Sequence, residues 1–291
     1  MQPEPDYGED TYRGSGKLEG RTAIITGGDS GIGRAVALAF AREGADVLIS
    51  YLAEEEPDAQ ETAQVVEAAG KKAVKMPGDI GEEAQCQRLI EQAISEFGKI
   101  DILVNNAAYQ MYREGLQSIS AEELEHTYRT NVFSIFYLCK AALPHMQPGS
   151  SIVNTCSVEA YQPQPMLLDY ASTKAAIVNF TKGLAMEVAQ QGIRVNSVAP
   201  GPVWTPLIPA TMPAEFVSRR VCLPVRSAGV SDRARRPACG ARSGLRLPGF
   251  PGGQLREWRD LGRDRRDPSA VENHSSIDTL GCTEGSMDGA R

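Results

Sequence analysis

A tyrosine and a lysine stand four residues apart within the stretch 152–182. Apolar residues recur there at helical spacing, which predicts a helix that stacks Tyr170 and Lys174 one turn apart on one face. A phenol with a pKa near 10 is a poor acid–base catalyst at neutral pH, but a nearby ammonium group favours the phenolate and lowers its pKa. Ser157, at the end of a predicted strand thirteen residues before Tyr170, is placed to hydrogen-bond the same substrate oxygen. The three side chains could therefore protonate a carbonyl oxygen, or deprotonate an alcohol, while a hydride moves to or from carbon.

The same pair is compatible with a surface helix that carries an incidental tyrosine and lysine, so the upstream sequence decides between the two interpretations. A short apolar strand at 23–25 is followed by the turn TGGDSGIG at 26–33 and then by apolar residues at helical spacing. Glycines in such a turn let the backbone approach a pyrophosphate, whose charge meets the N-terminal amides and dipole of the helix. The spacing is GxxxGxG rather than the standard GxGxxG, and glycine-rich turns also occur without ligands.

The end of the second predicted strand, 47–51, should carry the residue that binds the adenosine ribose. An Asp or Glu there would bind the 2′-hydroxyl and favour NAD, whereas a nearby Arg would favour NADP. The sequence has Tyr51 at this place, with three glutamates slightly later at 54–56. Because Tyr51 replaces the acid that would repel a 2′-phosphate, we expect NADP to be accepted, although no Arg or Lys there secures it. The cofactor is therefore NADP or NAD, with NADP favoured.

Strands and helices alternate through the region up to about residue 205, which predicts a doubly wound parallel sheet that binds its ligand at the carboxyl edge. Helices are predicted over 58–69, 82–97, 121–143 and from Tyr170 onward, and strands over 73–76, 102–104, 151–156 and 195–198. Asp79 follows one strand and could approach the adenine edge, and Asn106 follows the next. Asn131 falls among apolar residues of a helix. A buried Asn needs partners, so Asn131 is either a structural tie or part of a proton relay.

Several of these segments together resemble the short-chain dehydrogenase/reductase family in its single-domain Rossmann form. They are TGGDSGIG, the NNAA segment at 105–108, Asn131, Ser157, YASTK at 170–174 and PGPVWT at 200–205. The N-terminal arm, the DVLISYL segment with the glutamates after it, and SVEAYQPQPMLLDYASTK at 157–174 look closest to the bacterial general-stress, glucose/ribitol-dehydrogenase-like branch. The resemblance covers about residues 1–215. The segment NNAA stands where the family more often has NNAG.

The resemblance implies a role for each matching residue. Tyr170 would be the general acid–base, Lys174 would lower its pKa and bind the nicotinamide ribose, and Ser157 would orient the substrate oxygen. Asn131 would complete a proton relay through water. The residues implied to bind the dinucleotide are Gly27, Ser30, Gly31, Ile32 and Gly33 at the pyrophosphate, Tyr51 and Asn106 at the adenosine ribose, Asp79 and Ile80 at the adenine, and Pro200, Gly201, Val203, Thr205, Tyr170 and Lys174 toward the nicotinamide.

The implied activity is hydride transfer between NAD(P) and a small alcohol or carbonyl compound such as a sugar, a polyol or an aldehyde. One alternative is a non-catalytic dinucleotide-binding or redox-sensing protein, against which the intact Ser157, Tyr170 and Lys174 argue. A second alternative is a damaged, inactive remnant of such an enzyme, which the sequence after residue 215 favours.

Composition narrows the class of protein further. The chain has 291 residues, of which 42% are hydrophobic, enough for one large core. No apolar run reaches membrane-spanning length, and the first residues are polar and acidic rather than a signal peptide. The six cysteines lack metal-ligand spacing. Reduced thiols in a cytoplasmic protein without a metal site are therefore expected.

Charge divides the chain into unequal parts. Residues 1–20 are expected to form an N-terminal arm and residues 21–215 a catalytic domain with a truncated Rossmann fold. Residues 1–215 hold 16 Lys and Arg against 28 Asp and Glu, a net charge of −12, whereas residues 216–291 hold 14 Arg, no Lys and 9 acids, a net charge of +5. An Arg-rich segment suggests nucleic-acid binding at first sight. The family pattern, however, stops abruptly at this boundary.

Translation in a shifted frame explains residues 216–291 better than nucleic-acid binding does. The shifted frame takes bases two and three of each codon together with base one of the next codon, starting at Pro237. The codons of the given residues are compatible, in this frame, with a family-like helix and strand, then with VTGG, and with a stop codon at Val271–Glu272. Trp258 is the firmest point, because TGG followed by C or A must give Gly. We therefore interpret the chain from somewhere between 216 and 237 as a frameshift product that is poorly ordered, and expect no nucleic-acid or membrane partner. A homo-oligomer of the family's type is expected for the frame-restored protein.

Overall fold

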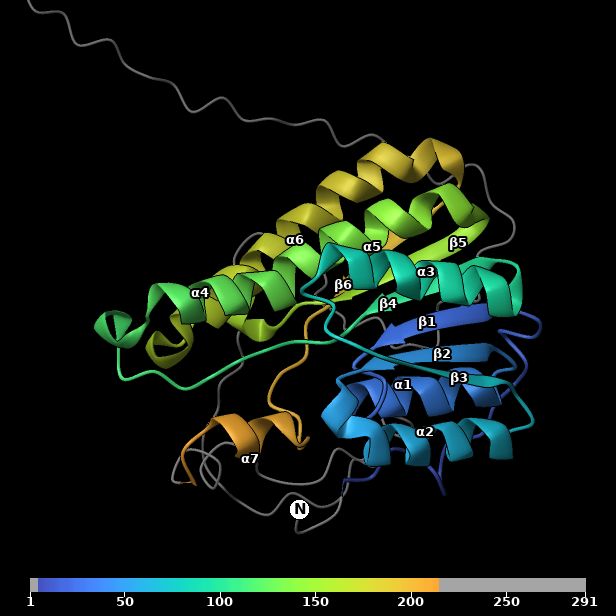
Figure 1. Cartoon of the computed structure of the whole chain (residues 1–291), viewed down its shortest axis with the longest axis horizontal. Helices are drawn as coiled ribbons and strands as arrows, with labels where there is room; N and C mark the ends of the chain where they lie inside the picture. Colours follow the sequence, from blue (N-terminus) through green and yellow to red (C-terminus); the bar gives the residue numbers. More distant parts are fainter. Residues whose placement is uncertain (1–4, 215–291) are drawn as a thin grey trace, which may run out of the picture. The chain divides into compact units, whose positions relative to one another are not determined.

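Short aliphatic runs of the sequence form the strands of one parallel sheet (Figure 1). The structure, a computed structural model, describes residues 5–214. Within these residues the sheet has six strands in the order β3-β2-β1-β4-β5-β6. The strands are β1 (Thr22–Thr26), β2 (Asp46–Tyr51), β3 (Ala73–Pro77), β4 (Ile100–Asn105), β5 (Met146–Thr155) and β6 (Arg194–Val198). The predicted doubly wound parallel sheet is confirmed.

Helices connect the strands and cover both faces of the sheet. They are α1 (Gly31–Arg42), α2 (Glu56–Ala68), α3 (Glu83–Phe97), α4 (Ala121–Tyr128), α5 (Ser134–Ala142), α6 (Leu168–Val188) and α7 (Leu207–Thr211). The chain runs outward from β1 to β3 and then crosses to β4 on the other side of β1. Because parallel crossovers are right-handed, this reversal puts α1 and α2 on one face and α3, α5 and α6 on the other. In agreement, α1 packs on α2, and α3 on α5.

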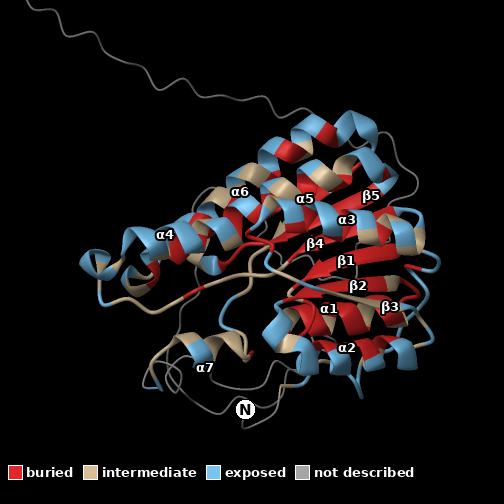
Figure 2. Cartoon of the chain, viewed as in Figure 1, coloured by how far each residue is buried: buried red, intermediate tan, exposed pale blue. Residues whose placement is uncertain are grey.

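The burial pattern follows from this layering. Strands β1 and β4 are buried at every residue, and Figure 2 shows the sheet as a buried layer between helices that expose their outer sides. Such strands are aliphatic throughout rather than alternating, as expected for a sheet covered on both faces. No helix within residues 5–214 has both the length and the apolarity to cross a membrane.

The strand order reverses between β1 and β4, which creates the crevice where doubly wound sheets bind ligands. Both strands point their carboxyl ends to the same edge, because Ile25 pairs in parallel with Val104. The glycine-rich turn after β1 and the polar residues after β4 and β5 therefore meet at that edge. The fold alone brings most of the predicted site residues to one place.

The helix predicted over 121–143 is interrupted. It consists of α4, a π-helical turn at Arg129–Phe133, and α5. The start is sharply defined, because Ser120 and Glu123 form a reciprocal capping box. A π turn adds one residue to a helical turn and often marks a functional position. Here it contains Asn131.

The N-terminal arm packs along α1. The hydroxyl of Tyr12 and the backbone amides of Ser15 and Lys17 donate hydrogen bonds to the Glu43 carboxylate at the end of that helix. These bonds lower the pKa of Glu43 despite its partial burial. Nearer the start of α1, the Arg34 guanidinium lies 4.9 Å from the centre of the Tyr7 ring. Polar groups of the described part of the arm thus tie it to the helix. The predicted frameshift product lies outside the described residues.

Candidate active site

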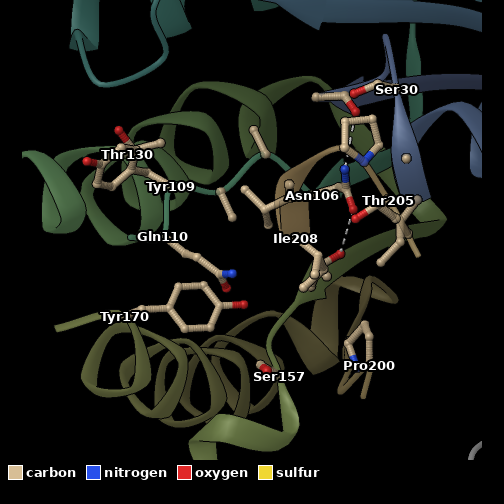
Figure 3. Close-up of a pocket in the computed structure, with 18 of the residues that line it drawn as sticks. Ser30, Asn106, Tyr109, Gln110, Thr130, Ser157, Tyr170, Pro200, Thr205 and Ile208 are labelled. Atoms are coloured by element: carbon tan, nitrogen blue, oxygen red, sulfur yellow. Dashed lines mark hydrogen bonds between the residues drawn. The ribbon is translucent and has the colours of Figure 1, made fainter. Parts of the chain in front are cut away.

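A cavity of about 470 Å³ opens at the carboxyl edge of the sheet, where β1, β4 and β5 end. Its walls come from the glycine-rich turn, the segments that follow β2, β3, β4 and β5, the start of α6 and the segment around α7. Figure 3 shows labelled residues of the glycine-rich turn, of the segments after β4 and β5, of α6 and of the segment 200–208 around one space. The size is typical of a small-molecule site.

Ser157, Tyr170 and Lys174 meet in this cavity, as the sequence predicts. Ser157 follows β5, and Tyr170 and Lys174 lie one turn apart in α6. The Ser157 hydroxyl is close enough to the Tyr170 phenol to counteract the rise in its pKa that burial causes. The Lys174 ammonium lies 5.2 Å from the centre of the Tyr170 ring and donates a hydrogen bond of 2.9 Å to the carbonyl oxygen of Thr155. The side chains of both Tyr170 and Lys174 are buried.

Burial dominates the electrostatics of this group. The pKa of Tyr170 is raised rather than lowered, and its lowering by the Lys174 ammonium stays a prediction. Burial raises the pKa of Tyr170 to about 12, the Glu159 carboxylate raises it further, and the nearby Ser157 hydroxyl opposes both. Burial also lowers the pKa of Lys174 to about 8. A fully buried ammonium with one hydrogen bond is poorly solvated, so its charge is costly and its influence on the phenol is small.

Asn131 serves as a tie in this structure. Its side-chain oxygen accepts a hydrogen bond of 2.7 Å from the Tyr109 amide, and its amide group donates to the Tyr109 carbonyl oxygen and the Thr173 hydroxyl. Asn131 is 1% exposed and is absent from the walls of the cavity. The π turn thus fixes the segment after β4 against α6. The proton relay through Asn131 stays a prediction.

The glycine-rich turn has the shape that a dinucleotide pyrophosphate requires. Gly27 and Gly31 have φ angles of 59° and 52°, a left-handed conformation that favours glycine. Their backbone lines the cavity together with Ser30 and Ile32. A Cβ atom on Gly33 would lie 1.8 Å from the Gly27 carbonyl oxygen, so only glycine lets the first turn of α1 approach this loop. Gly33 lies outside the cavity walls. Gly33 therefore has a packing role, and its contact with the dinucleotide stays a prediction.

Asn106 connects the ends of β1 and β4 at the floor of the same region. Its side-chain amide donates to the carbonyl oxygens of Thr26 and Gly27, and its backbone amide donates to the Thr26 hydroxyl. Thr155 donates weakly to the Asn106 side-chain oxygen. This network holds the glycine-rich turn beside the ends of β4 and β5.

The far end of the cavity matches the position expected for the adenosine. Tyr51 lines it, and its hydroxyl donates a short hydrogen bond to Glu56, which Lys75 also contacts. Burial and the Glu56 carboxylate raise the pKa of Tyr51. Asp79 and Ile80 line the cavity too, as predicted. No arginine, and no lysine other than Lys174, lines the described walls of the cavity, so nothing described there pairs with a 2′-phosphate.

The segment 200–205 closes the cavity on the nicotinamide side. The predicted residues Pro200, Gly201, Val203 and Thr205 all line it. A Cβ atom on Gly31 would lie 3.2 Å from that of Thr205, which shows how closely this segment crosses the glycine-rich turn. Across residues 5–214 no group of three or more His, Cys, Asp or Glu side chains is arranged to hold a metal ion. The turn, the close crossing and the buried base of the cavity fit a bound dinucleotide.

Sequence reasoning missed several lining residues. Glu55 follows β2 in a short helical turn and accepts a hydrogen bond from the Leu52 amide. Burial and the neighbouring carboxylates raise its pKa. Gln110, His126 and Glu159 also line the cavity. The only sequence signal for Gln110 was its place shortly after the end of β4, since nothing in its surroundings marks a buried amide.

Comparisons with known proteins agree with this geometry. The family model for short chain dehydrogenases matches residues 21–215. General stress protein 39 of Bacillus subtilis is 50% identical over 219 residues, covering 75% of this chain and 76% of the relative. NADPH-dependent aldehyde reductase 1 of Arabidopsis thaliana is 49% identical, covering 75% and 77%, and glucose and ribitol dehydrogenase of Daucus carota is 45% identical, again covering 75% and 77%.

The structure is also similar to solved ones. A short chain dehydrogenase of Burkholderia cenocepacia, crystallised with NADP, matches with a TM-score of 0.66 and 34% identity over 70% of this chain and 82% of that one. A blue fluorescent protein from a metagenomic library, crystallised with NADPH, matches with a TM-score of 0.64 and 34% identity over 69% and 83%.

Proposed function

The chain belongs to the short-chain dehydrogenase/reductase family and is an NAD(P)-dependent oxidoreductase, and from this premise we propose that it interconverts small aldehydes or ketones and their alcohols. The observation that carries the proposal is the meeting of Ser157, Tyr170 and Lys174 at the base of the cavity. The substrates in the names of its relatives, an aldehyde, glucose and ribitol, support a small oxygenated substrate.

Each residue has a part in the proposed reaction. The bound nicotinamide cofactor supplies the hydride in reduction and accepts it in oxidation. Ser157 hydrogen-bonds the carbonyl oxygen and aligns it with the nearby Tyr170 hydroxyl. Tyr170 then donates its proton to that oxygen as negative charge develops there. A pKa of about 12 keeps the phenol protonated at neutral pH, which suits it to act as the acid in reduction.

Lys174 would act on the phenolate that Tyr170 becomes. Its ammonium lies near the ring and is fixed by the Thr155 carbonyl oxygen. Opposite charges close together in a buried site attract strongly, so phenolate formation would favour the charged form of Lys174. In alcohol oxidation the same pairing would help Tyr170 to remove the proton from the hydroxyl.

The binding of the dinucleotide follows the walls of the cavity. Gly27, Ser30, Gly31 and Ile32 would contact the pyrophosphate through backbone groups at the start of α1. The other lining residues proposed to contact it are Tyr51, Asp79, Ile80, Asn106, Pro200, Gly201, Val203 and Thr205. Acceptance of NADP beside NAD, with NADP favoured, belongs to this proposal.

The proposal extends to assembly and location. Phe133 and Phe136 in and after the π turn are 40% and 51% exposed, and Met186 of α6 is 76% exposed. Exposed large apolar side chains on α5 and α6 are suited to pack against a second copy, which supports a homo-oligomer. The described cysteines, Cys86, Cys139 and Cys156, are buried free thiols, which supports a reducing, cytoplasmic location.

The test is a steady-state assay of the 291-residue protein with NADPH and NADH. Reduction of small aldehydes, followed by absorbance at the nicotinamide band, is the expected result, together with the reverse reaction on sugars or polyols. Binding of NADPH without turnover of any small aldehyde, ketone, sugar or polyol would leave a dinucleotide-binding protein and refute the proposed reaction.

A further inference from the structure

Charge in the reaction end of the cavity bears on the class of substrate. Lys174 is the only lysine or arginine among the described lining residues, and its ammonium is buried and bonded to the Thr155 carbonyl oxygen. Of the carboxylate residues that line the cavity, Glu159 is the one close enough to Tyr170 to raise its pKa. A substrate that carries a carboxylate or phosphate beside the reacting oxygen would meet repulsion from Glu159, without a matching cation among the described lining residues. The cavity is therefore suited to a neutral substrate.

Gln110 is the buried amide in this neutral environment. It is 4% exposed, yet it lines the cavity, and Figure 3 shows its carboxamide and the Tyr170 hydroxyl directed into the same space. Hydrogen bonds to the residues before and after Gln110 in the sequence fix its position. Asn131 holds the backbone of Tyr109 just before it, and the Tyr112 amide donates to the Thr211 carbonyl oxygen just after it.

The hydrogen bonds of Thr211 determine which end of the Gln110 amide faces the cavity. The Thr211 hydroxyl donates to the Leu207 carbonyl oxygen, so it can only accept from Gln110. Gln110 accordingly donates through Nε2 to the Thr211 oxygen at 3.0 Å. The side-chain oxygen, Oε1, is left toward the cavity as an acceptor. Oε1 is not one of the buried atoms that lack a partner, so it is open to the cavity and can exchange a hydrogen bond from water for one from a ligand hydroxyl.

We propose that Gln110 determines substrate specificity, by accepting through Oε1 a hydrogen bond from a hydroxyl that a neutral aldehyde or ketone carries on the carbon beside its carbonyl. This inference rests on the proposed function and narrows its substrates to hydroxylated ones. Gln110 also donates through Nε2 to Thr211 of α7. The residue proposed to contact the substrate hydroxyl therefore also holds α7 against the cavity.

The first experiment compares two aldehydes that differ in hydroxylation. The 291-residue protein, Gln110→Met and Thr211→Ser are assayed with NADPH on D-glyceraldehyde and on propanal. Met keeps the length and apolar volume of the side chain but removes the acceptor. We expect kcat/KM of Gln110→Met to fall about tenfold on glyceraldehyde, the cost of one neutral hydrogen bond, and to change less than about threefold on propanal.

Thr211→Ser is the matched control. It shortens the side chain but keeps the hydroxyl that accepts from Gln110, so Oε1 stays toward the cavity. We expect the glyceraldehyde-to-propanal ratio of kcat/KM to stay near that of the unmodified protein. Retained propanal activity shows that a variant is folded. An unchanged ratio in Gln110→Met, or a loss of the ratio in Thr211→Ser alone, would overturn the proposal.

A binding measurement separates failure of this inference from failure of the proposed function. With NADPH present, alcohols bind without turnover, so the Kd values of 1,2-propanediol and 1-propanol can be compared by saturation-transfer NMR. A Kd about tenfold lower for the diol in the unmodified protein, lost in Gln110→Met, supports the hydroxyl contact even if no aldehyde is reduced. Equal Kd values for the two alcohols in the unmodified protein overturn it.

Discussion

The buried ammonium of Lys174 should make the stability of the protein depend on pH in a defined way. Lys174 is 1% exposed, and burial lowers its pKa from 10.5 to about 8. Between pH 8 and 10.5 the unfolded state therefore binds more protons at this site than the folded state does. The free energy of unfolding must then rise with pH through this window, and the cost of the buried charge is fully present below pH 8.

The magnitude follows from the size of the shift. Each unit of pKa difference corresponds to about 1.4 kcal/mol, so the full cost at pH 7 is about 3 kcal/mol. At pH 9.5 most of the folded molecules carry a neutral Lys174, and about 2 kcal/mol of the cost is relieved. Lys174→Met removes the titrating group. The free energy of unfolding of Lys174→Met minus that of the unmodified protein should therefore decrease by about 2 kcal/mol from pH 7 to 9.5.

The assay is urea unfolding followed by circular dichroism at both pH values. Tyr170, whose pKa is raised to about 12, contributes the opposite slope only above about pH 10. The buried thiols of Cys86 and Cys139 have raised pKa values but are common to both proteins, so they cancel in the difference. Burial raises the pKa of Cys156 and the charge of Lys174 opposes this rise, so Cys156 is replaced by Ala in both proteins. Lys182→Met is the control, because Lys182 is exposed on the same helix. A difference between Lys174→Met and the unmodified protein that is the same at both pH values would show that Lys174 is not held as a costly buried charge.

Two further substitutions test the dinucleotide site. Tyr51→Asp should shift the preference from NADP toward NAD, because a carboxylate there repels the 2′-phosphate and can bind the 2′-hydroxyl; strong rejection of NADP by the unmodified protein in side-by-side kinetics would contradict the inference. Gly33→Ala would bring a Cβ atom within 1.8 Å of the Gly27 carbonyl oxygen, so the turn must deform. We expect the affinity for NADPH, measured by fluorescence titration, to fall at least about tenfold. Gly183→Ala is the control, because its Cβ position has open space, and this variant should bind NADPH normally.

Most of the site was predictable because parallel strands end at one edge. Ser157, Asn106 and the glycine-rich turn each follow a strand, so strand order alone brings them together. The i, i+4 spacing of Tyr170 and Lys174 then adds the reacting group from the neighbouring helix.

What the sequence could not predict depended on tertiary contacts. The raised pKa of Tyr170 follows from burial, which the spacing of two residues does not reveal. Gln110 has a functional position only because Thr211, 101 residues later, accepts its amide hydrogen. The tie made by Asn131 likewise requires the π turn, which no local propensity indicated.

Tyr170→Phe tests the central claim most directly. The substitution removes the transferable proton and leaves the ring and its packing in place. We expect turnover of any accepted aldehyde to fall by about two to four orders of magnitude, the usual span for a general acid–base, with NADPH affinity nearly unchanged. Tyr161→Phe, at an exposed tyrosine outside the cavity walls, is the control and should keep full turnover. Near-normal turnover in Tyr170→Phe would contradict the assignment of Tyr170 as the proton donor.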